Sequence, residues 1–207
     1  MAFEPLTPDR RRKQTRDHLL EAAAKVLAER GFQGASLDEV AAVAGFTKGA
    51  VYSNFKNKED LFLALLETLH ESEMVELQST LESSDVPPES RLEDFVKFMR
   101  EPPVDAGFNA TALYLEFCTY ALRNPTARAK LVALDEAMID SVAEIMGSER
   151  AKQNIDSNEP IRDLARIVQA FSRGLAIMRA LDPECVDEQF LETSIAFLAR
   201  ALVPPGS

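Results

Sequence analysis

The sequence predicts an all-α protein, with a small N-terminal three-helix domain followed by a larger helical domain. Apolar residues recur at helical spacing along nearly the whole chain, and no segment shows the alternation of a half-buried strand. Three segments rich in Pro, Gly, Ser and Asn interrupt this pattern, at residues 82–90, 101–109 and 147–160. The 207 residues are enough for both domains.

The first two helices have recognisable ends. The apolar stripe of the first consists of Leu19, Ala23, Val26 and Leu27. Gly31 predicts the end of this helix, because glycine favours the left-handed conformation of a C-terminal cap. The second helix is expected to begin at Ser36, since Glu39 three residues later completes a capping box. Gly45 is expected to end it.

The third helix is short and leads into a long fourth one. Thr47 is its expected N-cap, and Val51 and Phe55 point inward at i, i+4 spacing. Asn57 is expected to cap the fourth helix, whose apolar stripe is Leu61, Leu65 and Leu69.

Helices two and three are joined only by residues 45–47. Two short helices across a tight glycine-containing turn form a helix-turn-helix, whose second helix lies in the DNA major groove. Its expected outer face carries Lys48, Gly49, Tyr52 and Ser53, with Asn54 at the margin. An ordinary three-helix packing unit with a solvated third helix has the same spacing, so both interpretations stay open.

Lys58 stands in the first turn of helix four, where its charge opposes the helix dipole. We therefore expect it to contribute little to stability. A lysine beside a positive helix end suits a phosphate group instead.

The charge distribution is uneven. The whole chain has a formal net charge of −11, which argues against nucleic-acid binding by composition alone. Residues 1–60, however, hold ten basic and nine acidic residues, and residues 61–207 hold thirteen basic and twenty-five acidic ones. The run from Arg10 to Arg16 contains five basic residues and no acid. It is either a solvated tail or a phosphate contact.

Residues 15–66 resemble the DNA-binding domain of the TetR (tetracycline-repressor) family of bacterial regulators. The matching motifs are AAA and LAERGF in helix one, SLDEVAAVAG in helix two, TKGAVYSNF in helix three and KNKEDL at the start of helix four. The rest is similar only in general style, with LYLEF and LRNP near residues 113–125. The resemblance implies a DNA-binding domain at residues 10–72, with its helix-turn-helix at 36–55 and with helix four, from residue 58, shared with the next domain. It also implies an effector-binding and dimerisation domain at 73–207.

The resemblance also implies roles for single residues. The expected DNA-contacting residues are Ser36, Thr47, Lys48, Gly49, Tyr52, Ser53, Asn54 and Lys58. Ser36 would touch the DNA backbone, Tyr52 a phosphate or a thymine methyl, and Lys58 a phosphate. The chain departs from the common pattern at Ser53, which is too short for an obvious base contact. Asn54 could pair with adenine or serve only as a helix-end cap.

The C-terminal region, residues 160–202, has excess apolar surface. One helix has the stripe Leu164, Ile167, Val168, Phe171, Leu175 and Met178. The last helix is apolar on more than one face, so either a larger core or a partner subunit must cover it. The resemblance favours a homodimer built on a four-helix bundle. The expected interface residues are Leu164, Phe171, Leu175, Phe190, Phe197 and Leu198.

The middle of the chain, residues 89–146, is rich in aromatic residues and methionine. By pattern alone such residues form a core more often than a pocket. The resemblance implies that a small effector binds among these helices. The candidate lining residues are Phe98, Phe108, Tyr114, Phe117, Cys118 and Met138.

Other classes of protein find little support. No apolar run is long enough to span a membrane, and the N-terminus lacks the apolar core of a secretory signal, so we expect a cytoplasmic protein. Glu67 and His70 form a single Glu-x-x-His motif, and a di-iron bundle needs two. We therefore expect no metal, no cofactor and no enzymatic activity. The expected function is a repressor released from a palindromic operator by a small molecule; the alternative is an acidic helical ligand-binding or scaffold protein without operator binding.

Overall fold

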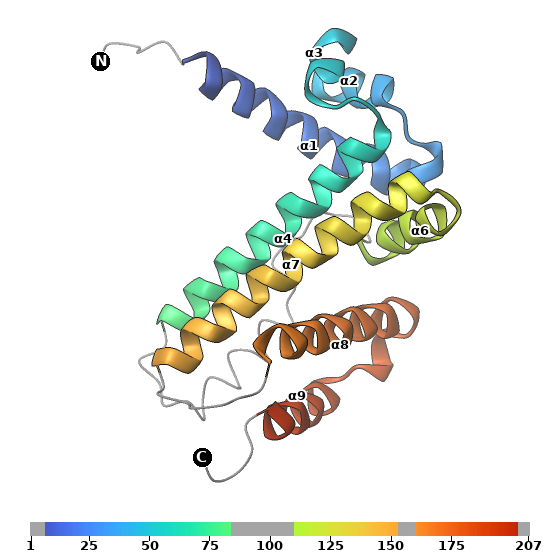
Figure 1. Ribbon diagram of the computed structural model, residues 1–207. Helices are drawn as coiled ribbons and strands as arrows, with labels where there is room; N and C mark the ends of the chain where they lie inside the picture. Colours follow the sequence, from blue (N-terminus) through green and yellow to red (C-terminus); the bar gives the residue numbers. More distant parts are fainter. Residues whose placement is uncertain (1–6, 84–109, 153–159, 203–207) are drawn as a thin grey trace. The chain divides into compact units, whose positions relative to one another are not determined.

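The computed structural model describes residues 7–83, 110–152 and 160–202 (Figure 1). Throughout these ranges the secondary structure is helical, without a strand, which confirms the predicted all-α class. The elements are α1 (Pro8–Gly34), α2 (Leu37–Ala44), α3 (Lys48–Asn54), α4 (Lys58–Ser83), α6 (Ala110–Arg123), α7 (Pro125–Lys152), α8 (Ile161–Leu181), the 3-10 turn η1 (Pro183–Cys185) and α9 (Glu188–Leu202). The predicted break at 101–109 and most of that at 82–90 lie outside the described residues.

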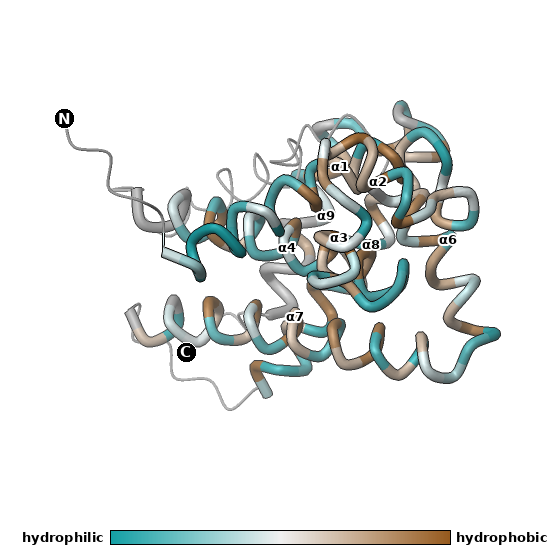
Figure 2. Tube along the Cα trace, turned by 90° about the horizontal axis from the view of Figure 1, so that it is seen from above, coloured by the Kyte–Doolittle hydropathy of each residue, from teal (hydrophilic) through white to brown (hydrophobic). Residues whose placement is uncertain are grey.

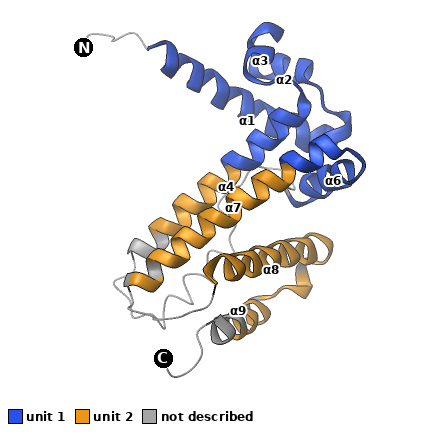
Figure 3. Cartoon of the chain, in the orientation of Figure 1, with its two compact units in different colours: residues 1–68, 106–130 blue, residues 69–105, 131–207 orange. Residues whose placement is uncertain are grey.

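The chain forms two compact units, coloured separately in Figure 3. Unit 1 comprises residues 1–68 and 106–130, and unit 2 comprises residues 69–105 and 131–207. The helices α4 and α7 each contribute residues to both units. These packing units differ from the functional domains expected at residues 10–72 and 73–207, because α6 belongs to unit 1.

In unit 1 most of the sequence signals for helix ends are confirmed. Gly45 ends α2 with a left-handed φ of 71°, as predicted. Gly31 has a left-handed φ of 67°, but it interrupts α1 and does not end it, since the helix continues to Gly34 and is capped at Ala35. The Ser36 hydroxyl accepts a hydrogen bond from the Glu39 N–H at 3.2 Å, as a capping box requires. The α3 cap at Thr47 and the α4 cap at Asn57 are made in the same way, by side-chain oxygens that accept from backbone N–H groups three residues on.

An aromatic cluster fills unit 1 where α6 packs against α1 and α4. The rings of Phe32, Phe62, Phe117 and Tyr120 lie in mutual contact, with Phe32 and Phe117 at a centroid distance of 4.9 Å and nearly perpendicular. Edge-to-face pairs of this kind are favourable beyond the area that they bury. Glu116 accepts a hydrogen bond from the Phe32 N–H at 2.6 Å, where the break at Gly31 leaves that donor without a helical partner. The cluster therefore anchors α6 to the N-terminal helices.

In unit 2 ion pairs link α7 to α8. Arg162 contacts Glu136 and Asp140, each at 2.6 Å, and Arg173 contacts Asp135 at 2.5 Å. Figure 2 shows hydrophobic and hydrophilic residues alternating along α7.

The predicted break at 147–160 is wrong at its start, because α7 continues through Gly147 to Lys152. A single glycine inside a helix costs only about 1 kcal/mol, which good helix formers on both sides offset.

Candidate nucleic-acid interface

The helix α3 has one buried side and one exposed side. Val51 and Phe55 are fully buried, which confirms their predicted inward orientation. On the other side, Lys48, Gly49, Tyr52 and Ser53 are exposed, and Tyr52 as a residue is 54% exposed. An exposed tyrosine on a short helix between two tight turns leaves a large amphipathic ring free for a partner.

Gly49 has no reason within the chain to be glycine. Its φ lies outside the left-handed region, and the nearest atom to a Cβ built there is the Thr47 Oγ1, at 3.8 Å. Glycine also weakens a helix relative to alanine. The absence of a side chain at this position is thus unexplained by folding, and close approach by another molecule explains it.

Lys48 and the end of α3 are held by contacts inside the unit. The Lys48 Nζ lies 2.7 Å from the Asp38 carboxylate of α2, and this hydrogen bond raises the pKa of Lys48. Both partners are exposed, so the pair is weak and a phosphate can compete for the lysine. The hydroxyl of Ser53 and the side-chain amide of Asn54 both donate to the Ala50 carbonyl at 2.8 Å. A base contact by Asn54 would require its amide to leave that carbonyl.

Lys58 has partners within unit 1 that the sequence analysis did not predict. Its Nζ donates to the Gln33 carbonyl at 3.0 Å and lies 4.8 Å from the centroid of the Phe32 ring. The ammonium thus satisfies a carbonyl at the end of α1 and makes a cation–π contact, and partial burial lowers the pKa of Lys58. Sequence reasoning missed this role because Gln33 lies 25 residues earlier in the chain.

The start of α4 is also tied to α6 and α7. The Tyr120 hydroxyl donates to Glu59, and the Asn124 amide donates to the Tyr120 oxygen at 2.8 Å. Lys130 pairs with Asp60 at 2.5 Å. The first turn of α4 therefore has partners on α6 and α7 within unit 1.

The candidate effector residues are divided among unit 1, unit 2 and the part of the chain outside the described residues. Phe98 and Phe108 lie outside the described residues. Tyr114, Phe117 and Cys118 belong to α6 in unit 1, where Phe117 is fully buried in the aromatic cluster and the other two are half-buried. Met138 is buried on α7 in unit 2.

Unit 2 contains a group of ionisable side chains that the sequence analysis did not select as a site. On α4, burial and the charge of Arg173 lower the pKa of His70, and burial raises the pKa of Glu73. The buried Nε2 atom of His70 has no hydrogen-bond partner among the described residues. Arg173 on α8 is paired with Asp135 on α7. Glu73 could have been found from the sequence, because it continues the i, i+4 series of the α4 stripe four residues after Leu69.

The candidate interface residues divide by burial. Leu164 and Leu175 are buried inside unit 2 itself, and Phe171 is half-buried. Phe190 and Phe197 are exposed, and the side chain of Leu198 lies outside the described part of the chain. The described helices α8 and α9 also expose Ile167, Met178 and Leu181.

Two further properties concern the described residues only. None of their helices is both long and apolar enough to cross a membrane. Nowhere among them do three or more His, Cys, Asp or Glu side chains come together as metal ligands.

Comparisons with known proteins agree with this geometry. Residues 19–65 match a family model described as bacterial regulatory proteins of the tetR family, and residues 88–203 match one described as BetI-type transcriptional repressor, C-terminal. The regulator AcrR of Shigella flexneri is 42% identical over 66 residues, which make up 32% of this chain and only 30% of that relative.

The solved structures extend the likeness in fold over the whole chain. A TetR-family regulator from Rhodococcus sp. has a TM-score of 0.72 at 21% identity, covering 92% of this chain and 98% of the other. A regulator from Saccharomonospora viridis, solved in complex with choline, has a TM-score of 0.63 at 18% identity, covering 91% and 96%. The named relatives are described as transcriptional regulators.

Proposed function

Because the chain belongs to the TetR family of bacterial transcriptional regulators, we propose that it represses transcription by binding a palindromic DNA operator as a homodimer in the cytoplasm. The observation that carries this proposal is the exposed side of α3. It presents Tyr52 to solvent and a glycine at position 49 that the fold does not need. We assign DNA binding to residues 10–72, and effector binding and dimerisation to residues 73–207.

The test is binding of the purified full-length protein to DNA. A duplex selected by the protein from a random pool is compared with an unselected duplex of the same length at physiological salt. We expect the protein to bind the selected duplex more tightly than the unselected one. We expect Tyr52→Ala to reduce the affinity for the selected duplex and to reduce the ratio between the two affinities. Failure to select any sequence would support the acidic scaffold or ligand-binding protein instead.

Dimerisation is supported by the apolar side chains that α8 and α9 leave exposed. Since Leu164 and Leu175 are already buried in the monomer, we place the interface on Phe171, Phe190 and Phe197 together with the exposed residues Ile167, Met178 and Leu181. Two reading heads related by a two-fold axis require half-sites about one helical turn apart, ~34–36 Å, or a multiple of it. Footprinting should show two symmetric protected half-sites.

We propose further that a small molecule bound in unit 2 releases the operator. Support comes from the buried Nε2 atom of His70, since a buried polar atom without a hydrogen-bond partner among the described residues is rare unless a ligand or water satisfies it. Helical spacing places Met138 on the same side of α7 as Asp135. The expected effector is therefore amphipathic, with a polar group for His70 and an apolar body.

The effector proposal is tested in two steps. Thermal shift identifies compounds that stabilise the protein, and each is then added to the protein–operator complex. Ligand and operator must weaken each other by the same factor, typically about 1–3 kcal/mol of coupling. A set of tight-binding compounds that all leave operator affinity unchanged would contradict induction by ligand.

A further inference from the structure

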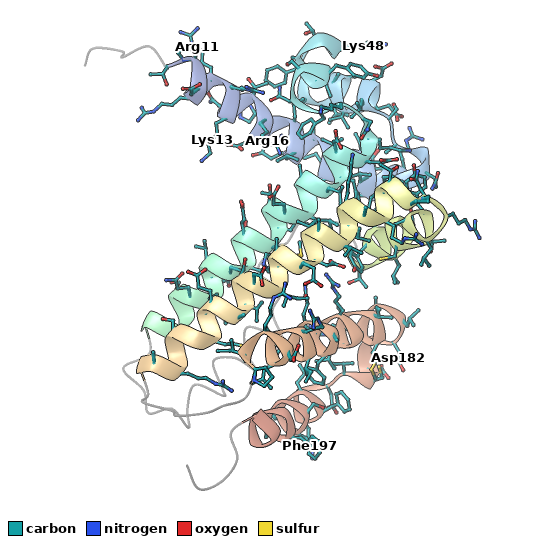
Figure 4. All side chains as sticks on the ribbon, viewed as in Figure 1. Arg11, Lys13, Arg16, Lys48, Asp182 and Phe197 are labelled. Atoms are coloured by element: carbon teal, nitrogen blue, oxygen red, sulfur yellow. The ribbon has the colours of Figure 1, made fainter. Side chains whose placement is uncertain are left out.

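The basic run near the N-terminus is part of a structured groove. Residues 10–16 lie within the first three turns of α1 and are not a flexible tail. An open groove of about 370 Å³ is lined by Asp9, Arg12, Lys13 and Arg16 of α1 and by Asn54 of α3. The four α1 residues follow the i, i+3, i+4, i+7 spacing of a single helix face. Figure 4 shows Lys13 and Arg16 on this part of α1.

The charge in this groove is mostly positive. One carboxylate stands among three cationic side chains. Arg16 is fixed in place, because its guanidinium carbon lies 4.7 Å from the centroid of the Phe55 ring, at the end of α3. Arg12 and Lys13 are exposed and make no ion pair among the described residues. The groove thus combines one anchored cation with two that are available to a partner.

These charges do not serve the folding of α1. Arg16 lies three and four positions after Lys13 and Arg12 on one face of α1, and like charges at this spacing destabilise a helix. A partner with negative charge accounts for their presence.

We propose that a second DNA-contact surface is formed by Arg12, Lys13 and Arg16. This surface contacts the phosphate backbone next to the half-site that α3 binds. The proposal rests on the proposed operator binding. Its geometric basis is Asn54, which belongs both to the groove and to the margin of the exposed side of α3, so the groove adjoins that side. The cationic groove complements a backbone that carries one negative charge per phosphate.

The test compares the full-length wild-type protein with the double variant Arg12→Ala/Lys13→Ala. Affinity for the selected duplex and for the unselected duplex is measured by fluorescence anisotropy over a range of salt concentrations. Each lost phosphate contact should lower the log–log salt slope by about 0.9, which gives about 1.8 per chain and about 3.6 per dimer. Both duplexes should lose affinity by a similar factor, since backbone contacts carry no sequence information.

Two matched variants separate the charge effect from other effects. Arg123→Ala/Arg128→Ala removes the same charge from exposed positions of α6 and α7 in the same unit and should leave the slope unchanged. Arg12→Lys/Lys13→Arg keeps both charges and should keep the slope. Thermal unfolding should show that Arg12→Ala/Lys13→Ala is no less stable than the wild type, since it removes like charges three and four positions before Arg16 on the same helix face.

Hydroxyl-radical footprinting locates the contact. The double variant should lose protection only at the outer flanks of the site and keep protection of the two half-sites. A wild type that selects no DNA would refute the proposed function itself. A wild type that selects DNA, with slope and flanks unchanged in the double variant, would overturn this inference alone and assign the groove to an acidic partner other than DNA.

Discussion

At the scale of single residues, a substitution at Gly49 should affect stability and DNA affinity in opposite directions. Gly49→Ala adds a methyl group that meets only Thr47 Oγ1 at 3.8 Å. The variant should gain about 0.5–1 kcal/mol of stability, because alanine is the better helix former. Its operator affinity should fall about tenfold, or about 1.4 kcal/mol, if DNA approaches the backbone here. Thermal unfolding and anisotropy measure the two effects, and unchanged affinity would show that nothing approaches closely at this position.

Lys58 combines two roles that a pair of measurements can separate. Lys58→Ala removes the hydrogen bond to Gln33 and the contact with Phe32, so stability should fall by about 0.5–1.5 kcal/mol. If the ammonium also reaches a phosphate, the salt slope should fall by about 0.9 per contact, or about 1.8 for a dimer, on operator and random DNA alike. A loss of stability with an unchanged slope would remove Lys58 from the DNA interface and leave it as a purely structural residue.

Glu73 should destabilise the protein at neutral pH. Burial raises the pKa of its carboxyl, so the ionised form is less favourable in the folded protein than in the unfolded chain. This residue favours folding at pH values below its unfolded pKa, and the benefit is lost as the pH rises through the folded pKa. At pH 7, Glu73→Gln should therefore raise the Tm, by about 2–4 °C for each kcal/mol of stability gained.

The pH dependence of the Tm tests whether the buried Glu73 carboxyl causes the difference between the two proteins. Near pH 4 the wild type and Glu73→Gln should have nearly the same Tm, because the carboxyl is protonated in both folded and unfolded protein. Glu76→Gln, at an exposed position of the same helix, is the matched control and should change little at either pH. His70 acts in the opposite direction, since its lowered pKa makes acidification destabilising, and it contributes equally to all three proteins.

At the scale of elements, the break in α1 positions α6. Gly31 has a φ of +67°, and a Cβ there would lie 2.8 Å from the Glu116 Oε2 that accepts from Phe32. Gly31→Ala should cost about 1–3 kcal/mol from backbone strain alone, with a further loss from displacing Glu116. Gly34→Ala is the control, since its φ is not left-handed and its nearest contact is 3.4 Å. Differential scanning calorimetry should show a lower Tm only for Gly31→Ala; equal Tm values would mean that α1 does not require this break.

At the scale of the whole molecule, the exposed apolar side of α8 and α9 predicts the assembly. Phe197 is 73% exposed in the single chain (Figure 4). Phe197→Asp should therefore leave the monomer folded but bury an unpaired charge in a dimer, at a cost of several kcal/mol. Leu122→Asp is the matched control, because Leu122 is also 73% exposed but lies on α6.

Light scattering at micromolar concentration distinguishes the outcomes. The wild type and Leu122→Asp should have twice the 22.9 kDa of the chain, and Phe197→Asp should have the mass of one chain with an unchanged helical circular dichroism spectrum. A wild type with the mass of one chain would contradict the proposed dimer, and also the symmetric operator that depends on it.

Much of unit 1 could be predicted because its signals are local. Caps at Ser36, Thr47 and Asn57, and the left-handed glycines at 31 and 45, depend on residues within three or four positions of one another. The same locality explains the wrong break at Gly147, where one glycine and one serine are too weak a signal to end a helix with good helix formers on both sides. Gln33, the partner of Lys58, lies 25 residues away in the sequence, and Glu116, the partner of Phe32, lies 84 residues away. No local sequence pattern predicts such contacts.

By itself, the sequence determined the helical class, the ends of the first helices and the inward side of α3, because helix periodicity and capping are properties of neighbouring residues. Only the tertiary structure decided that Lys58 completes the end of α1, that Phe117 belongs to a packed aromatic core and that Leu164 and Leu175 are covered within one chain. Periodicity shows that a side of a helix is apolar. What covers that side depends on contacts between segments far apart in the chain, which form only when it folds.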